Sequence, residues 1–169
     1  MGDNMSDYCV VVTGGAHARF YTLEPVDFPE LESGPTLVHY RDLFNPQKES
    51  AGKDLYADPK TGRGRAARGG PAHGYDDHRS GHEYEADRRF SRKILSETCS
   101  LVKAHNARCV VLVAPAPMLG ILRQELHVLN KHGVEVKKVV KDMTKFSPRR
   151  IHESLARQNM LPERRKPGA

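Results

Sequence analysis

Three arginines alternate with small residues near the middle of the chain. Arg63, Arg65 and Arg68 are separated by glycine and alanine alone, and Gly69 and Gly70 follow them directly. Guanidinium groups bind phosphate oxygens through planar pairs of hydrogen bonds, and small neighbours let a polyanion approach the backbone closely. Each phosphate that is neutralised also releases counterions. The stretch therefore predicts a contact with the phosphate backbone of a nucleic acid.

A second group of cations, Arg88, Arg89 and Arg92, follows in a segment with helical periodicity. The whole chain has 27 Lys and Arg against 21 Asp and Glu, a net charge of +6. That balance favours polyanionic partners and says nothing about the fold. Tyrosines are sparse around the glycine-rich stretch, so we expect recognition of the backbone rather than stacking on bases. The alternative interpretation is a solvated loop that binds nothing.

Side chains that can bind metals gather just after the glycine-rich stretch. Imidazole and carboxylate groups are ligands for zinc and related ions. The spacing here matches no closed metal site, and the intervening glycines make ordering the ligands costly. We therefore expect no cofactor, with His73, His78 and His82 as weak candidates for adventitious metal binding. The full cluster is His73, Asp76, Asp77, His78, His82 and Glu83.

Hydrolytic chemistry finds little support. A two-metal nuclease needs clustered carboxylates, but the first apolar run ends in Thr13-Gly14, and Asp142 stands alone after a later one. Ser147 lies outside any Gly-x-Ser-x-Gly motif and is placed to cap a helix instead. Cys9 and Cys109 lie in apolar runs, where thiols serve as small core residues. We assign no catalytic residue.

Apolar patterning predicts a single α/β domain over residues 7–160, interrupted by a polar excursion at 45–84. Short β-branched runs indicate strands, and apolar residues three and four positions apart indicate helices. Strands are expected at 8–13, 16–23, 36–43, 108–114 and 134–140, and helices at 83–105, 117–131 and from 148 onward. The order β-β-β-α-β-α-β-α is the topology of a ribonuclease H-like domain, a five-stranded mixed sheet flanked by helices. Its first and fourth strands are neighbours, which brings Cys9 near Cys109.

Polar sequence also marks the regions outside the core. Residues 45–84 are rich in glycine and poor in apolar side chains, so we expect a flexible loop there. The basic tail, residues 161–169, is expected to be disordered. Residues 1–7 are polar, and no segment approaches the ~20 apolar residues that span a bilayer. These features predict a cytoplasmic protein without a membrane partner.

Three segments resemble one bacterial family. They are VVTGGAHARFY at residues 11–21, VLVAPAPMLGILR at 111–123, and Lys141-Asp-Met-Thr144 with Ser147-Pro148 and Ile151. Together they are similar to the host attachment protein family, whose members are described as required for attachment to host cells. The resemblance covers roughly residues 8–155. Because the sequence shows no export signal, any effect on attachment is expected to be indirect.

This family in turn resembles the middle domain of archaeal and eukaryotic peptide chain release factors and of Pelota-type ribosome rescue factors. In release factors, a basic loop ending in Gly-Gly-Gln lies between the third strand and the long helix. Here Gly69-Gly70 is followed by Pro71, which lacks an N–H and fixes φ. The resemblance therefore implies entry into the ribosome without hydrolysis of peptidyl-tRNA.

The leading hypothesis is a non-catalytic RNA- or ribosome-binding protein, with ribosomal RNA or tRNA as its partner. A metal-dependent small hydrolase using the 73–83 cluster is one alternative, and metal-dependent hydrolysis of RNA would favour it. A protein–protein adaptor, whose basic loop binds an acidic partner, is another. The predicted contact residues are Arg63, Arg65, Arg68, Gly69, Gly70, Arg88, Arg89 and Arg92.

Overall fold

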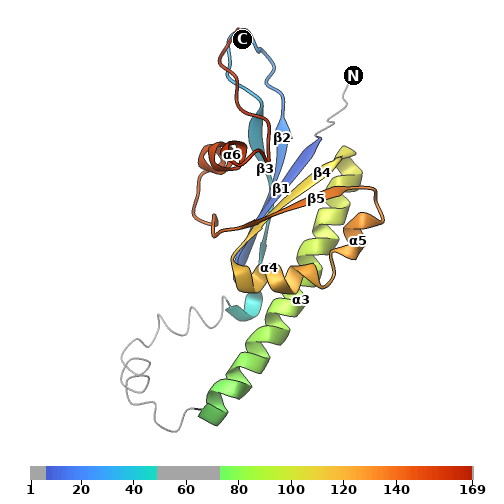
Figure 1. Cartoon of the computed structure of the whole chain (residues 1–169), viewed down its shortest axis with the longest axis vertical. Coiled ribbons are helices and arrows are strands. Elements are labelled where there is room, and N and C mark those ends of the chain that lie inside the picture. Colours follow the sequence, from blue (N-terminus) through green and yellow to red (C-terminus); the bar gives the residue numbers. More distant parts are fainter. Residues whose placement is uncertain (1–6, 49–72, 169) are drawn as a thin grey trace.

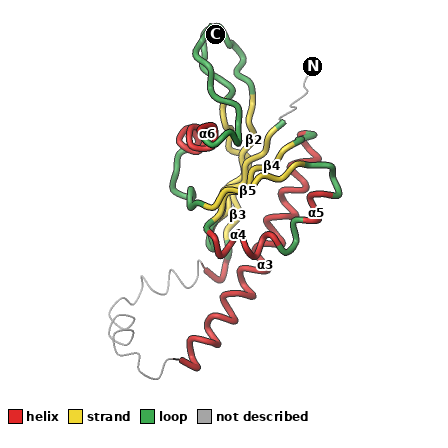
Figure 2. Tube along the Cα trace, viewed as in Figure 1, coloured by secondary structure: helices red, strands yellow, loops and turns green. Residues whose placement is uncertain are grey.

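The computed structural model describes residues 7–48 and 73–168. They form a five-stranded mixed sheet with helices on both faces (Figures 1 and 2). The order across the sheet is β3-β2-β1-β4-β5; β2 is antiparallel to β1 and β3, whereas β1, β4 and β5 are parallel. The predicted α/β class with a five-stranded mixed sheet is confirmed. The strands are β1 (Tyr8–Thr13), β2 (His17–Glu24), β3 (Thr36–Phe44), β4 (Cys109–Ala114) and β5 (Glu135–Val140).

β1 and β4 form the centre of the sheet. Every residue of β4 is buried, and so is every residue of β1 after Tyr8. A strand with a neighbour on each side and helices on both faces has no side facing solvent, which explains these unbroken apolar runs. The outer strands β3 and β5 instead expose several of their side chains, as edge strands commonly do.

The helices divide between the two faces of the sheet. α3 (His73–His105), α4 (Ala116–Arg123) and α5 (His127–Asn130) cover one face, and α6 (Pro148–Arg157) covers the other (Figure 1). Phe90 and Ile94 of α3 belong to one apolar core, and Ile151 and Leu155 of α6 belong to the second. The sheet therefore has a core on each side.

Two helices differ in extent from their predictions. α3 begins at His73 rather than at 83, inside the segment expected to be a loop. A helix that has already formed gains one hydrogen bond per added residue, so glycines weaken it by about 1 kcal/mol each without ending it. The helix expected at 117–131 is split into α4 and α5. Between them, the backbone N–H groups of Gln124 and Glu125 donate to the carbonyls three residues earlier, those of Ile121 and Leu122. Such bonds form tighter turns than the α-helix and interrupt it.

The start of α6 is confirmed as predicted. The Ser147 hydroxyl accepts a hydrogen bond from the Arg150 backbone N–H at 3.2 Å, and Pro148 occupies the first turn. Phe146 and Ile151, on either side of this cap, pack in the same core. A side-chain cap, a proline and an apolar pair across them define this helix start.

Composition predicts a disordered tail over residues 161–169, but the structure places residues 161–168, the C-terminal segment, against the rest of the chain. Leu161 is buried in the α6-side core. Gly34 and Arg165 exchange two backbone hydrogen bonds, at 3.2 and 2.8 Å, and Gly168 donates to the Pro29 carbonyl at 3.0 Å. An apolar anchor and paired backbone groups hold a segment whose composition alone suggested a tail.

Two of the cysteines lie on the adjacent strands β1 and β4, as predicted. Cys9 is in register with Val110, and Cys109 with Tyr8. Both thiols are buried and free, and they belong to the cores on opposite faces of the sheet. Burial, with a smaller contribution from Cys109, raises the pKa of Cys9 to about 12. Among the described helices, none is long and apolar enough to cross a membrane.

Candidate nucleic-acid interface

The parallel strands β1, β4 and β5 end at one edge of the sheet, and the N-terminal half of α3 extends past this edge (Figure 1). Ligands of open α/β sheets bind outside the carboxyl ends of the strands. The Gly14-Gly15 turn after β1 lies here. A Cβ on Gly15 would lie 3.5 Å from Asp87 of α3 and 3.8 Å from Lys48. The turn, α3 and the chain after β3 therefore meet at this edge.

The three arginines predicted on α3 have different environments. Arg89 is exposed, and its Nε donates to the Glu85 carbonyl of its own helix at 3.4 Å. Arg92 is exposed, but its Nε bonds Glu125 at 3.0 Å. Arg88 is half-buried, with an Nε that has no hydrogen-bond partner among the described residues. Of the three, Arg89 is the cation best placed to bind a ligand from solution.

A cleft of 200 Å³ lies between α3 and residues 45–47. Ala86 and Phe90 contribute its apolar wall, and Arg89 and Lys93 contribute two cations. No carboxylate is among the described residues that line it. Lys93 was not predicted as a contact residue, although its position four residues after Arg89 places both on the same face of a helix. We call this feature the α3 cleft.

The other five predicted contact residues all lie outside the described residues. They are Arg63, Arg65, Arg68, Gly69 and Gly70, within 49–72. The side chains of the metal candidates His73 and His78 are also not described. His82 and Glu83 are exposed, and Glu83 faces Lys48 at 4.0 Å. Within 7–48 and 81–168, no group of three His, Cys, Asp or Glu residues could hold a metal ion.

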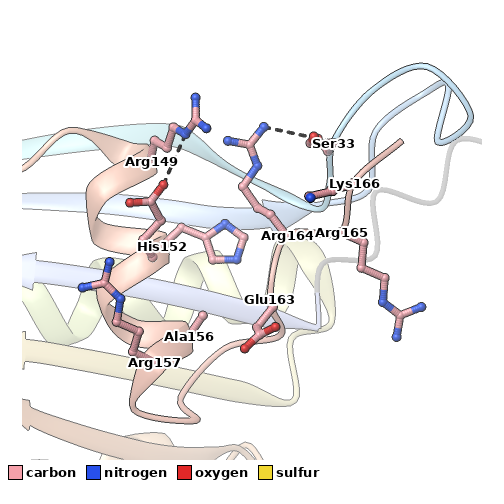
Figure 3. Close-up of a pocket in the computed structure, with 10 residues that line it drawn as sticks. Ser33, Arg149, His152, Ala156, Arg157, Glu163, Arg164, Arg165 and Lys166 are labelled. Atoms are coloured by element: carbon pink, nitrogen blue, oxygen red, sulfur yellow. Dashed lines mark hydrogen bonds and ion pairs between the residues drawn. The ribbon is translucent and has the colours of Figure 1, made fainter. Parts of the chain in front are cut away.

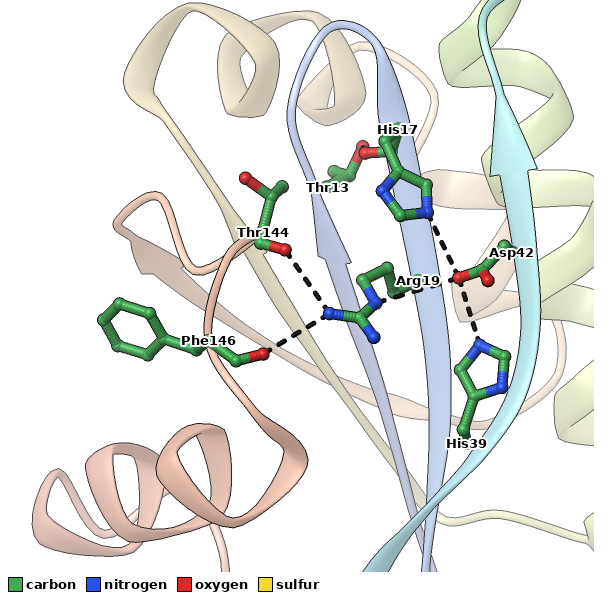
Figure 4. A network of polar contacts seen from close by, with 7 residues as sticks. All are labelled: Thr13, His17, Arg19, His39, Asp42, Thr144 and Phe146. Carbon is green, nitrogen blue, oxygen red and sulfur yellow. Dashed lines mark hydrogen bonds and ion pairs between the residues drawn. The ribbon is translucent and has the colours of Figure 1, made fainter.

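A polar network that the sequence did not predict lies on β2 and β3 (Figure 4). Asp42 Oδ1 contacts the Nε2 atoms of His17 and His39, at 3.2 and 3.0 Å. Burial raises the pKa of Asp42, but the hydrogen bonds from His39 and His17 outweigh it, and the pKa is lowered overall. Arg19 lies 3.8 Å from the same oxygen and donates to the carbonyls of Thr144 and Phe146. The network therefore ties the sheet to the loop after β5.

Residues 9–155 match the family described as "Protein required for attachment to host cells". The chain belongs to this family. The match begins one residue into β1 and ends two residues before the end of α6, so it takes in nearly the whole sheet and most of both cores. No curated protein and no solved structure matches the chain.

The segments that resemble the host attachment family converge on the carboxyl edge of the sheet. The Gly14-Gly15 turn follows β1, Pro115 occupies the N-cap position of α4 after β4, and Asp142 and Thr144 follow β5. A Cβ on Gly14 would lie 3.5 Å from the Thr144 methyl group, so two of these segments are in direct reach of each other. The three segments that resemble the family therefore lie together at the carboxyl ends of the parallel strands, beside the α3 cleft.

Asp142, a carboxylate that follows a strand where a nuclease would hold metal ions, accepts hydrogen bonds from its own loop. Its Oδ1 accepts hydrogen bonds from the Thr144 backbone N–H at 3.0 Å and from the Thr144 hydroxyl at 2.6 Å. At the end of β1 the corresponding residue is Thr13, whose hydroxyl donates to the Gly14 carbonyl at 2.8 Å. In this chain the two positions form local turns and do not pair carboxylates.

Proposed function

We propose that this protein binds RNA without catalysis, through contacts of the α3 cleft with the phosphate backbone. The observation that carries the proposal is that two cations, Arg89 and Lys93, lie on one face of α3 and line the same cleft. No carboxylate is among the described residues that line this cleft. Two cations at a concave surface that lacks carboxylates attract phosphates more strongly than cations that are already paired.

The position of the α3 cleft supports the proposal further. The arginine- and glycine-rich stretch leaves the described chain after Lys48 and rejoins it at His73. Residues 45–47, which line the cleft, therefore lead directly into the stretch that contains Arg63, Arg65 and Arg68. A nucleic acid bound at the cleft would have this second set of cations available within the same chain.

Ribosomal RNA or tRNA is the partner we propose, in keeping with a relation to the middle domain of release and rescue factors. The strand order β3-β2-β1-β4-β5, with α3 between β3 and β4, supports a ribonuclease H-like topology of that kind. Pro71 in place of the glutamine of Gly-Gly-Gln supports binding without hydrolysis.

The test is fluorescence anisotropy with labelled single-stranded RNA over a salt series, together with sedimentation of ribosomes. The double variant Arg89→Gln/Lys93→Gln removes two cations from the α3 cleft. The control variant Lys131→Gln/Lys138→Gln removes two exposed cations beside α5 and on β5, the outer strand farthest from β3. We expect the first variant to bind more weakly and its salt slope to shrink by about 0.7 for each phosphate that is no longer neutralised. The second variant should match the wild type.

Equal weakening of both variants would mean that net charge alone drives binding, and it would refute the cleft as the site. Absence of RNA binding at low salt would refute the function. A partner protein retained independently of salt would then favour the adaptor hypothesis.

A further inference from the structure

A second cleft, of 330 Å³, lies between α6 and the C-terminal segment (Figure 3). We call it the C-terminal cleft. Its cations come from two separate elements: Arg149 and Arg157 from α6, and Arg164, Arg165 and Lys166 from the C-terminal segment. The carboxylates that line it are Glu153 and Glu163, and Glu153 is held by Arg149 at 3.3 Å. The excess of positive charge suits an anionic ligand.

His152 contributes a buried acceptor to this cleft. The residue is 1% exposed, and its Nε2 lies 2.7 Å from the Pro162 carbonyl oxygen. Because a carbonyl oxygen can only accept, Nε2 carries the hydrogen of this bond. Nδ1 of the neutral ring is then an acceptor, and within the described part of the chain it is buried without a hydrogen-bond partner. Figure 3 shows the ring directed from α6 toward the C-terminal segment.

Arg164 contributes a buried donor to the same cleft. Its Nη2 donates to the Ser33 carbonyl at 3.4 Å, which fixes the guanidinium beside the loop before β3. Its Nε is buried and has no hydrogen-bond partner in residues 7–48 and 73–168. Buried polar groups are nearly always paired, so an unpartnered donor and an unpartnered acceptor in one cleft indicate a ligand that offers both kinds of group.

We propose that the C-terminal cleft binds a phosphate group. Hydrogen phosphate carries anionic oxygens, which accept from Arg164, Arg157 and Lys166, and one hydroxyl, which can donate to His152 Nδ1. A carboxylate or a sulfate has no such hydroxyl at neutral pH and would leave Nδ1 unpartnered. The site is independent of the α3 cleft, because it lies on the opposite face of the sheet.

The experiment is calorimetric titration of the full chain with inorganic phosphate at pH 7.5, repeated with sulfate and with chloride at equal ionic strength. We expect saturable binding of phosphate, weaker binding of sulfate and none of chloride. Arg164→Gln should weaken phosphate binding by about tenfold or more, because a charge-assisted donor is removed. Lys131→Gln, an exposed change of equal charge beside α5, should have no effect.

His152→Gln is the sharper variant. The amide nitrogen of the glutamine can still donate to the Pro162 carbonyl, but glutamine has no acceptor at the position of the histidine Nδ1. We expect phosphate binding to fall to the level of sulfate binding, with an unchanged thermal midpoint in the absence of ligand. A variant that retains the preference for phosphate would overturn the role of Nδ1, and equal binding of phosphate and chloride would overturn the site.

Adenosine 5′-monophosphate distinguishes the two sources of such a group. The ester phosphate of this nucleotide is mainly a dianion without a hydroxyl at pH 7.5. Tighter binding than inorganic phosphate would therefore assign the site to a larger ligand in which another hydroxyl donates to His152 Nδ1. Weaker binding assigns it to the free anion. Both results require that Arg164→Gln weaken binding of that ligand by about tenfold or more, and an unchanged affinity would overturn the site for either ligand.

Discussion

Asp142 gives the most direct view of how single residues shape the carboxyl edge of the sheet. The two hydrogen bonds from Thr144 favour the charged carboxylate, and so they lower the pKa of Asp142. A carboxyl group with a lower pKa in the folded state stabilises that state above its unfolded pKa, and the contribution is lost as pH falls through the folded pKa. The loop after β5 should therefore loosen in acid.

Thr144→Val tests this coupling. Valine keeps the methyl group that faces Gly14 and removes the hydroxyl that donates to Asp142. The pKa of Asp142 should rise toward its ordinary value, because the side-chain hydrogen bond is the largest cause of its depression. Carboxyl NMR titration measures the change, and Asp42, whose lowered pKa depends on His39 and His17, is the internal control. A pKa of Asp142 that stayed unchanged would contradict the assignment.

Single residues differ in how far sequence can predict them. Ser147 and Pro148 act locally, and their roles as cap and first-turn residue follow from their order alone. The contact of Asp42 with His17 and His39 depends on the pairing of β2 with β3, which has an irregularity in register between Phe20 and Tyr21. A shift in register changes which side chains share a face of the sheet, and alternation along one strand does not reveal it.

At the scale of elements, one glycine inside α4 and another after α5 have opposite effects on stability. Gly120 lies inside α4, with open space where a Cβ would stand. Gly133 follows α5 and has a φ of +70°, in the left-handed region that side chains with a Cβ disfavour. The first weakens the helix through its conformational entropy, and the second permits the turn into β5.

Alanine at these two positions should therefore change stability in opposite directions. Gly120→Ala is expected to raise the free energy of unfolding by about 0.5–1 kcal/mol. Gly133→Ala is expected to lower it by about 1–2 kcal/mol, the cost of a Cβ in the left-handed region. Urea denaturation of both variants with the wild type measures the two values, and changes of the same sign would show that the turn at Gly133 can relax.

Strands could be predicted more closely than helices because the sheet is buried. β4 is apolar throughout and β1 is apolar up to its last residue, Thr13, so their limits nearly coincide with the limits of hydrophobic runs. The start of α3 at His73 lies beyond any apolar pattern, since that part of the helix extends past the edge of the sheet (Figure 1). Periodicity reports which residues face a core, and it carries no information on a helix that continues without one.

At the scale of the whole molecule, the C-terminal segment joins parts of the chain that are distant in sequence. Arg165 pairs with Gly34 through backbone hydrogen bonds, and Gly168 reaches the Pro29 carbonyl. These bonds involve backbone atoms, so the identity of the side chains gives no sign of them. Composition therefore predicts disorder for residues 161–169, because it does not reveal these backbone bonds or the burial of Leu161.

Ending the chain after Pro162 tests this arrangement. The change keeps Leu161 in the core. It turns the Pro162 carbonyl into a terminal carboxylate, which still offers an oxygen to His152 Nε2, and it removes every partner that residues 163–168 offer to the loop before β3. The Gly34 amide should then exchange with solvent at least about tenfold faster, because its acceptor is removed. Amides of β1, in the centre of the sheet, should keep their protection.

Phosphate binding at the C-terminal cleft should disappear together with Arg164, whereas RNA binding at the α3 cleft should persist. Loss of both activities with protection of β1 unchanged would show that the two clefts are not independent, and unchanged exchange at Gly34 would contradict the pairing itself.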